Sequence, residues 1–459
     1  MKINKIYSAI SVALFATALT ACSSFQEDDL FDESASLRIT KFNEDLQARL
    51  VEQCTEGKYG WVIQYFVGSE SKGYNLFGRF DASGKVTLAS NHPYLRGGNA
   101  NKYTEYVSSY EMLREDGPVL AFNTWNDILT VFVDPVDPSQ APSTIVNDGE
   151  GMKGDHNFLF HAYEGQNILF RGQRHAAGIR FVPCDRPWED YITDADAFKN
   201  SITNSTFNNF YVTDGKDTMY FSGLNNGLFT YQERLIDPLQ SEPCACVFSV
   251  DGFRLKNKGQ LGEKSFQNFT ISDQKDCLYN EDKTVRVIPT WDNYIINTRT
   301  AVWNYDMAQM SNDQNVLLEQ INAELRKYNK NYSIAQVGLG QSKGKGAING
   351  LVITFYTNAA KTKTNTAGVA LTNIRTAYGQ MQISYSDANK VDGNLESLGK
   401  KSDIVTVARQ FAATLSGTFN IVPNGYFLPT GCELHAVDGG SNYLVVLYRF
   451  NFGIFNCAK

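Results

Sequence analysis

Three histidines that lie close together in the sequence raise the question of a metal site. His156 and His161 belong to one apolar stretch that reads as a strand, and His175 follows the next strand. Successive side chains of a strand point to opposite faces, so the odd separation of His156 and His161 places them on opposite sides unless a bulge intervenes. Zinc needs three or four converging ligands. We therefore expect no metal here and predict no cofactor.

Cys244 and Cys246 would share one face of a strand. Their spacing differs from the Cys-x-x-Cys spacing of redox and zinc sites. Pairing of one of them with Cys184 or Cys277 is the more favoured use, provided that the chain is exported to an oxidising compartment.

Two loops resemble ion-binding motifs and miss the required spacing. In 338–346, Gly340 and Gly344 are one residue too close for a phosphate loop, and Gly346 stands where Ser or Thr would hold magnesium. This stretch is better read as a basic hairpin loop. In 387–396, oxygen-bearing side chains are spaced almost like a calcium loop, but Gly393 is shifted by one position. A turn is the expected structure, with a weak calcium site as the alternative.

Aromatic residues make up 13% of the chain, with 24 Tyr and 29 Phe. Most should lie in cores or in cross-strand pairs. Trp125 and Trp188 stand beside polar residues, so we select them as candidate ligand-binding residues. The chain lacks Gly-x-Ser-x-Gly and His-Glu-x-x-His, two common hydrolase signatures. We assign no catalytic residue and expect a protein that is not an enzyme.

The elements that must position these residues are mostly strands. Helical spacing of apolar residues predicts four helices, at 35–54, 193–204, from Ser311 onward, and 402–416. Short apolar runs separated by turn residues fill most of the remainder. We predict a mainly β (α+β) protein with two antiparallel β-sheet domains, sandwich or barrel-like, each with packed amphipathic helices. The expected domains are 34–283 and 290–459.

An internal duplication is a further interpretation. Residues 198–208 resemble 411–420, because in both a helix ends and a Phe leads into a strand. The alternative is that helix ends and strand starts use similar residues in every protein.

The first residues of the chain predict where the protein is located in the cell. Lys2 and Lys5 precede an apolar run that ends in Leu19-Thr20-Ala21-Cys22. This order is typical of an export signal, and the run is too short to span a membrane in the ordinary way. It resembles the lipobox of bacterial lipoproteins, which implies a signal peptide at 1–21 and a lipidated Cys22. The alternative is a plain secretory signal with an incidental cysteine.

Residues 22–33 form an acidic tether. The tether resembles the surface-export tract of Bacteroidetes lipoproteins, although a solvated linker would look the same. We expect an outer-membrane protein, attached through its lipid and exposed on the cell surface. Nucleic-acid-binding proteins usually carry a basic surface, whereas the net charge of this chain is −7. We therefore expect no nucleic-acid partner.

Several short motifs resemble one family. They are Tyr59-Gly60-Trp61, 116–120 with 122–126, Gly154-Asp155-His156-Asn157-Phe158, 168–172 and 248–252. Together they are similar to the Bacteroidetes lipoproteins grouped as domain-of-unknown-function family 4302, over roughly 34–283. The resemblance implies surface lipoproteins that are often associated with SusC- and SusD-like outer-membrane uptake systems. It assigns no activity and no catalytic residue.

Three functions remain open on this basis. The leading hypothesis is a non-enzymatic lipoprotein that binds a glycan or a polypeptide as an accessory to uptake. The second is a structural or adhesive envelope protein without a small ligand. The third is a hydrolase whose site carries no recognised signature, which clustered acids in a deep pocket would support.

Overall fold

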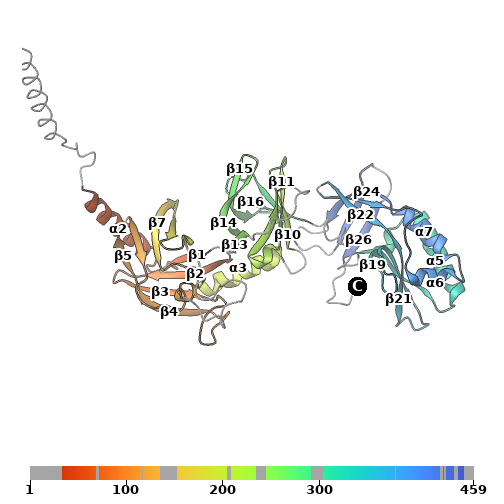
Figure 1. Ribbon diagram of the computed structural model, residues 1–459, viewed down its shortest axis with the longest axis horizontal. Coiled ribbons are helices and arrows are strands. Elements are labelled where there is room, and N and C mark those ends of the chain that lie inside the picture. Colours follow the sequence, from red (N-terminus) through yellow and green to blue (C-terminus); the bar gives the residue numbers. More distant parts are fainter. Residues whose placement is uncertain are drawn as a thin grey trace, which may run out of the picture. The chain divides into compact units, whose positions relative to one another are not determined.

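The chain folds into three antiparallel β-sheets with helices packed against them (Figure 1). The computed structural model describes residues 34–68, 72–115, 117–134, 152–203, 208–233, 244–290, 303–377, 379–423, 427, 431–438 and 443–448. The predicted mainly β, antiparallel class is confirmed. The predicted domain 34–283 contains one whole open sheet and seven of the eight strands of a closed barrel, whose last strand begins at Arg286.

The N-terminal body consists of α2 (Ala35–Glu52) and a nine-stranded sheet in the order β4-β3-β2-β1-β9-β8-β7-β6-β5. Its strands are β1 (Trp61–Phe66), β2 (Gly73–Phe80), β3 (Lys85–Ser90), β4 (Thr104–Ser109), β5 (Glu111–Arg114), β6 (Pro118–Ala121), β7 (Asn157–Glu164), β8 (Asn167–Gly172) and β9 (Gly178–Pro183). Leu46 and Leu50 of α2 are buried in the core of this body, and the indole of Trp61 donates a hydrogen bond to the Leu50 carbonyl at 3.0 Å. The helix is thereby fixed to the first strand.

The second sheet is a closed eight-stranded barrel. Its strands are β10 (Asn209–Thr213), β11 (Thr218–Ser222), β12 (Leu228–Gln232), β13 (Cys244–Phe248), β14 (Gly252–Leu261), β15 (Lys264–Ile271), β16 (Leu278–Asn280) and β17 (Arg286–Pro289). Pairing of β10 with β17 closes the ring. Phenylalanines fill much of the interior, as expected when inward-facing residues of a small barrel must pack its centre.

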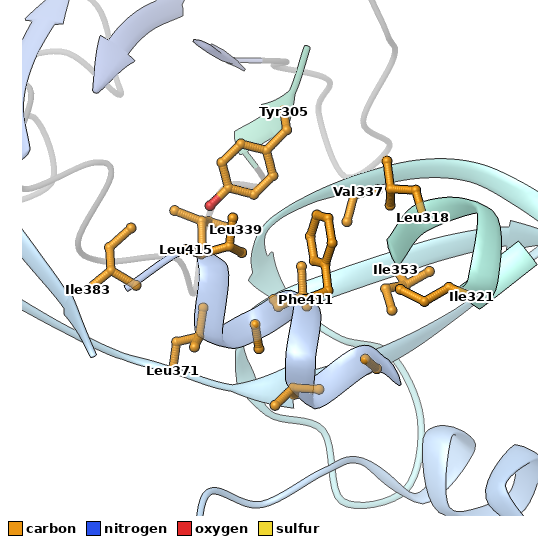
Figure 2. Close-up of a cluster of buried hydrophobic side chains, with 14 of the residues drawn as sticks. Tyr305, Leu318, Ile321, Val337, Leu339, Ile353, Leu371, Ile383, Phe411 and Leu415 are labelled. Atoms are coloured by element: carbon orange, nitrogen blue, oxygen red, sulfur yellow. The ribbon is translucent and has the colours of Figure 1, made fainter. Parts of the chain in front are cut away.

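The C-terminal body is a second nine-stranded sheet, in the order β21-β20-β19-β18-β26-β25-β24-β23-β22. Its strands are β18 (Trp303–Tyr305), β19 (Ser333–Gln341), β20 (Asn349–Tyr356), β21 (Thr364–Ala370), β22 (Thr372–Ala377), β23 (Gln380–Ser384), β24 (Gly417–Pro423), β25 (Gly431–Ala436) and β26 (Tyr443–Tyr448). Helices α5 (Asn312–Tyr328), α6 (Gly393–Gly399) and α7 (Ile404–Thr414) belong to this body. Figure 2 shows Phe411 and Leu415 among apolar side chains of its core, including Leu339 and Ile353.

Three of the four predicted helices lie where expected. The capping box between Ser311 and Gln314 is confirmed, because each side chain bonds to the backbone of the other residue. The helix predicted from Thr193 begins earlier, since α3 spans Trp188–Ile202. Pro187 stands directly before it, and Glu189 and Asp190 occupy the first turn, where carboxylates favour the positive end of the helix dipole. The short helix α6 was not predicted.

The chain divides between Asp190 and Tyr191 into two compact units. The interval between the two domains expected from the sequence, 284–289, contains β17. The polar residues before β17 form the turn from β16, in which the backbone N–H of Val285 donates to Asn280 Oδ1 at 2.8 Å. Three short 3₁₀ turns complete the described elements: η1 (Thr130–Phe132), η2 (Leu224–Asn226) and η3 (Met307–Gln309). Within the described residues, no helix is both long and apolar enough to cross a membrane.

Candidate ligand-binding site

The candidate site lies on the segment that follows β6 and covers the free edge of β4. The backbone N–H of Ser109 in β4 donates to Thr124 Oγ1 at 2.8 Å. The side-chain amide of Asn126 donates to Ser108 Oγ at 2.8 Å. Asn126 Oδ1 also accepts the N–H of Ile128 at 3.0 Å, which closes a turn over a single residue. This turn holds Trp125 at the surface on a well-anchored piece of backbone.

Trp125 is the one tryptophan of the described residues that is substantially exposed, at 44%. Its indole N–H donates to Asp127 Oδ1. The guanidinium of Arg96, from the segment between β3 and β4, lies over the ring with 5.1 Å from Cζ to the ring centroid. Arg96 also forms an ion pair with Asp134 at 3.4 Å. An aromatic face is thus framed by one cation and two carboxylates.

A cluster of aromatic rings lies under this surface. Phe132 of η1 is buried, 4.7 Å from His92 and 6.1 Å from Tyr94 between ring centroids. His92 Nε2 donates to the carbonyl of Ile128 at 2.9 Å, and Nδ1 accepts the N–H of Tyr94 at 3.3 Å. The bond to Ile128 ties the segment that carries Trp125 to the segment that carries Arg96. Burial lowers the pKa of His92 to about 4.

This arrangement suits a ligand that has both an apolar face and hydroxyl groups. An indole offers a flat surface for C–H groups, while carboxylates accept hydrogen bonds and a guanidinium donates them. The sequence singled out Trp125 but not its partners. Asp127 is only two residues away and could have been noticed, whereas Arg96 and Asp134 come near only through the fold.

Trp188, the other candidate, has a different environment. It is 5% exposed, its indole N–H donates to the carbonyl of Tyr59 at 2.7 Å, and its ring packs 5.8 Å from Phe77. Arg79 lies over the ring at 4.9 Å. These contacts give Trp188 a packing role.

The motif Gly154-Asp155 holds a loop together. Asp155 is buried, and its carboxylate accepts the backbone N–H groups of Arg174 at 2.7 Å, His175 at 3.0 Å and Ala177 at 3.2 Å. A Cβ at Gly172 would lie 1.9 Å from Asp155 Oδ2, which explains the glycine there. The buried carboxylate thereby fixes the turn from β8 to β9.

The strand that carries His161 has the bulge that would be needed to bring His156 and His161 to one face. His161 lies at a β-bulge of β7, between the pairs of Phe160 and Ala162, so the regular alternation is broken there. His156 and His161 are both exposed, and His175 Nδ1 lies 2.9 Å from the carbonyl of Gly154. No group of three or more potential metal ligands occurs within the described residues.

The predicted disulfides are absent from the described part of the chain. Cys54, Cys184, Cys244, Cys277 and Cys432 are free thiols. Cys246 lies in the barrel core and Cys244 packs against it, so both thiols do share one strand face, as predicted. They act as small apolar residues, and burial raises the pKa of the Cys244 thiol. Cys22 and Cys457 lie outside the described residues.

The two loops that resembled ion-binding motifs meet in the C-terminal body. The amide of Asn394 donates to the carbonyl of Lys343 at 3.0 Å, and the N–H of Gly393 donates to the carbonyl of Lys345 at 3.0 Å. Asp392 caps α6, with its Oδ1 accepting the N–H of Leu395 at 2.8 Å. The predicted turn in 387–396 is therefore a helix start packed on the glycine-rich loop.

The fold and the site define a multi-sheet antiparallel β protein with an exposed aromatic surface in its N-terminal body. A family model described as Domain of unknown function (DUF4302) matches residues 27–273, which is more than half of the 459 residues. The chain belongs to this family, as the motifs predicted.

The other comparisons add little. No curated protein matches the chain. Among solved structures, it is similar to the DNA polymerase III beta chain of Streptococcus pneumoniae at 8% sequence identity, with 89% of this chain and 97% of that chain covered and a TM-score of 0.13. A likeness of this size carries no argument about fold or function.

Proposed function

We propose that this protein is a non-enzymatic surface lipoprotein that binds carbohydrate through Trp125. The observation that carries the proposal is the exposed indole, held in place by Asp127 and flanked by Arg96. A sugar ring presents C–H groups on one face and hydroxyls around its rim, so it complements this combination. A rigid, pre-formed aromatic surface also binds with a small loss of entropy.

Carbohydrate is favoured over polypeptide because of how the polar groups are arranged. Each carboxylate already has one partner. Asp127 accepts a hydrogen bond from the Trp125 indole, and Asp134 forms an ion pair with Arg96. Each keeps lone pairs that can accept hydroxyl protons. A peptide that binds by strand addition would need an open strand edge. The edge of β4 is covered by Thr124 and Asn126.

Replacing Trp125 by alanine is expected to weaken glycan binding by about 10- to 100-fold, as for an anchor residue at the centre of an interface. The native protein and the variant are compared on an array of plant and host oligo- and polysaccharides, and the strongest ligand is then measured by calorimetry. Val107→Ala is the matched control, because Val107 is the most exposed large apolar residue of the same body, at 62%. An array without any signal for the native protein would favour the structural or adhesive role instead.

The anchor is the second part of the proposal. Lys2, Lys5 and the run ending at Cys22 support acylation of the Cys22 thiol and attachment to the outer membrane. More than one acyl chain is needed for stable attachment. On the cell surface, a glycan-binding lipoprotein would act as an accessory to an uptake system of the SusC and SusD kind.

Cys22→Ser is expected to abolish labelling by radioactive palmitate and to release the protein from the membrane fraction. Cys54→Ser is the control, since Cys54 is a half-buried thiol that lies just after the end of α2. Protease treatment of intact cells then tests surface exposure. Undiminished palmitate label on the Cys22 variant would disprove the lipid anchor while leaving the glycan site to its own test.

A further inference from the structure

The N-terminal and C-terminal bodies share one strand order. Numbered by position in the chain, both sheets run 4-3-2-1-9-8-7-6-5, with β18–β26 taking the places of β1–β9. Every pairing is antiparallel in both. The first strand of each begins with a fully buried tryptophan, Trp61 or Trp303. The helices occupy different places, since α2 precedes the first strand whereas α5, α6 and α7 lie between strands.

Individual hydrogen bonds repeat as well. In both sheets a single residue, Tyr110 or Leu371, joins the fourth strand to the fifth, which lies at the opposite end of the sheet order. The N–H of Tyr110 donates to the carbonyl of Gly84 at 2.8 Å. The N–H of Leu371 donates to the carbonyl of Asn349 at 3.1 Å, at the same point of the pairing between the third and fourth strands.

The segment after the sixth strand also has the same role in both bodies. In the N-terminal body it covers the edge of β4, through the bond from Ser109 N–H to Thr124. In the C-terminal body the N–H of Ala370, the matching last residue of β21, donates to the carbonyl of Lys390 at 2.8 Å. An asparagine side chain assists each time, and that of Asn389 donates to the carbonyl of Ala370 at 2.7 Å. The two segments are therefore structural counterparts.

The counterpart segment carries a similar set of side chains at another position, because Trp125 follows the edge contact of Thr124 whereas Tyr385 precedes that of Lys390 and packs partly on the core. Tyr385 Oη donates to Asp387 Oδ1 at 2.8 Å, as the Trp125 indole donates to Asp127 two residues further on. The guanidinium of Arg409, from α7, donates to the carbonyls of Asp387 and Asn389. Each body thus has an aromatic ring bonded to an aspartate two residues later, with an arginine beside it.

We propose that Tyr385, Asp387 and Arg409 form a second carbohydrate-binding site, so that the chain binds the same ligand class twice. This inference rests on the proposed function of the Trp125 surface. Asp387 is exposed and Tyr385 is half-buried, so the second site offers a smaller stacking face than the first. It is expected to bind more weakly, with hydrogen bonds to hydroxyls contributing a larger share.

The test is calorimetry of the full-length protein without its leader, using maltoheptaose, xylohexaose, mannohexaose and chitohexaose. The native protein is expected to bind one of these probes at two sites of unequal affinity. Trp125→Ala should remove the stronger site, Tyr385→Ala the weaker one, and the double variant both. Asp387→Ala, a change of an exposed side chain, should weaken the second site about 10-fold without affecting folding.

Tyr356→Ala is the matched control, because Tyr356 is another half-buried tyrosine of the C-terminal body with a cation over its ring, Lys361 at 5.8 Å. If Trp125→Ala alone abolishes all binding and Asp387→Ala changes nothing, the second site is disproved while the proposed function stands. If the native protein binds none of the probes, both proposals fall. If only the Tyr385 and Asp387 variants lose binding, the Trp125 site is the one that is wrong.

Discussion

Replacing Asp155 by asparagine is expected to lower the free energy of unfolding of the N-terminal body by about 3 kcal/mol. Its carboxylate accepts three backbone N–H groups in a buried position, and such charge-assisted bonds are stronger than neutral ones. An amide has one acceptor oxygen, and its NH₂ group would face N–H donors. The backbone N–H of His175 or Ala177 would then be left buried without a partner.

Urea denaturation followed by circular dichroism measures this change. Asp45→Asn is the matched control, because Asp45 is an exposed residue of α2 and its change should stay within about 0.5 kcal/mol. If the two asparagine variants are equally stable, the carboxylate does not fix the turn from β8 to β9. The motif around Asp155 would then need another explanation.

Local patterns predicted the individual elements well. The apolar spacing of α7 gave a correct buried face, with Ile404, Phe411 and Leu415 all fully buried. The Tyr59-Gly60-Trp61 motif leads directly into a strand, since β1 begins at Trp61. At Gly60, φ is +73° and a Cβ would lie 2.5 Å from the carbonyl oxygen of Gly78, so glycine is required. Such features depend on a few neighbouring residues, and these are visible in the sequence.

The assembly of strands into sheets was not predictable in the same way. The barrel closes because β10 pairs with β17, for example Phe210 with Pro289. These residues are far apart in the chain, so no local sequence pattern predicts the pairing. Arg96 likewise reaches Trp125 only because the segments before β4 and after β6 meet at one edge. Trp188 also has polar neighbours in the sequence, but its ring is buried, and local sequence does not distinguish it from Trp125.

The duplication suggested by the sequence pairs other elements than the topology does. The similarity of 198–208 to 411–420 would match β10 of the barrel with β24. The strand order instead matches β24 with β7. The repeated edge contact uses a threonine hydroxyl in one body and a backbone carbonyl in the other, at Thr124 and Lys390. The strand order is shared while the residues at the edge contact differ, so the sequence carries little sign of the shared order.

The stability of the N-terminal body is expected to fall by about 3 kcal/mol between pH 6.5 and pH 4 because of His92. Burial lowers the pKa of His92 from 6.5 to about 4. The hydrogen bond that Nε2 donates to Ile128 raises the pKa and opposes this shift, whereas Nδ1 can accept the N–H of Tyr94 only in the neutral ring. A proton on Nδ1 would face the N–H of Tyr94.

The sign follows from the two pKa values. Between pH 4 and 6.5 the unfolded chain binds a proton that the folded chain does not, so acid favours unfolding. The contribution is fully present above pH 6.5, is lost as the pH falls toward 4, and is constant below that. Chemical denaturation at a series of pH values measures it.

His92→Gln is the variant that separates this effect from the titration of carboxylates. Its amide can still donate to the carbonyl of Ile128 but does not titrate, so the difference in unfolding free energy between native protein and variant should shrink as the pH falls. His156→Gln is the control, because His156 is an exposed histidine of the same body. A constant difference between native protein and the His92 variant from pH 7 to pH 4 would show that His92 is not held neutral. The bond to Ile128 would then have to tolerate a charged ring beneath the Trp125 surface.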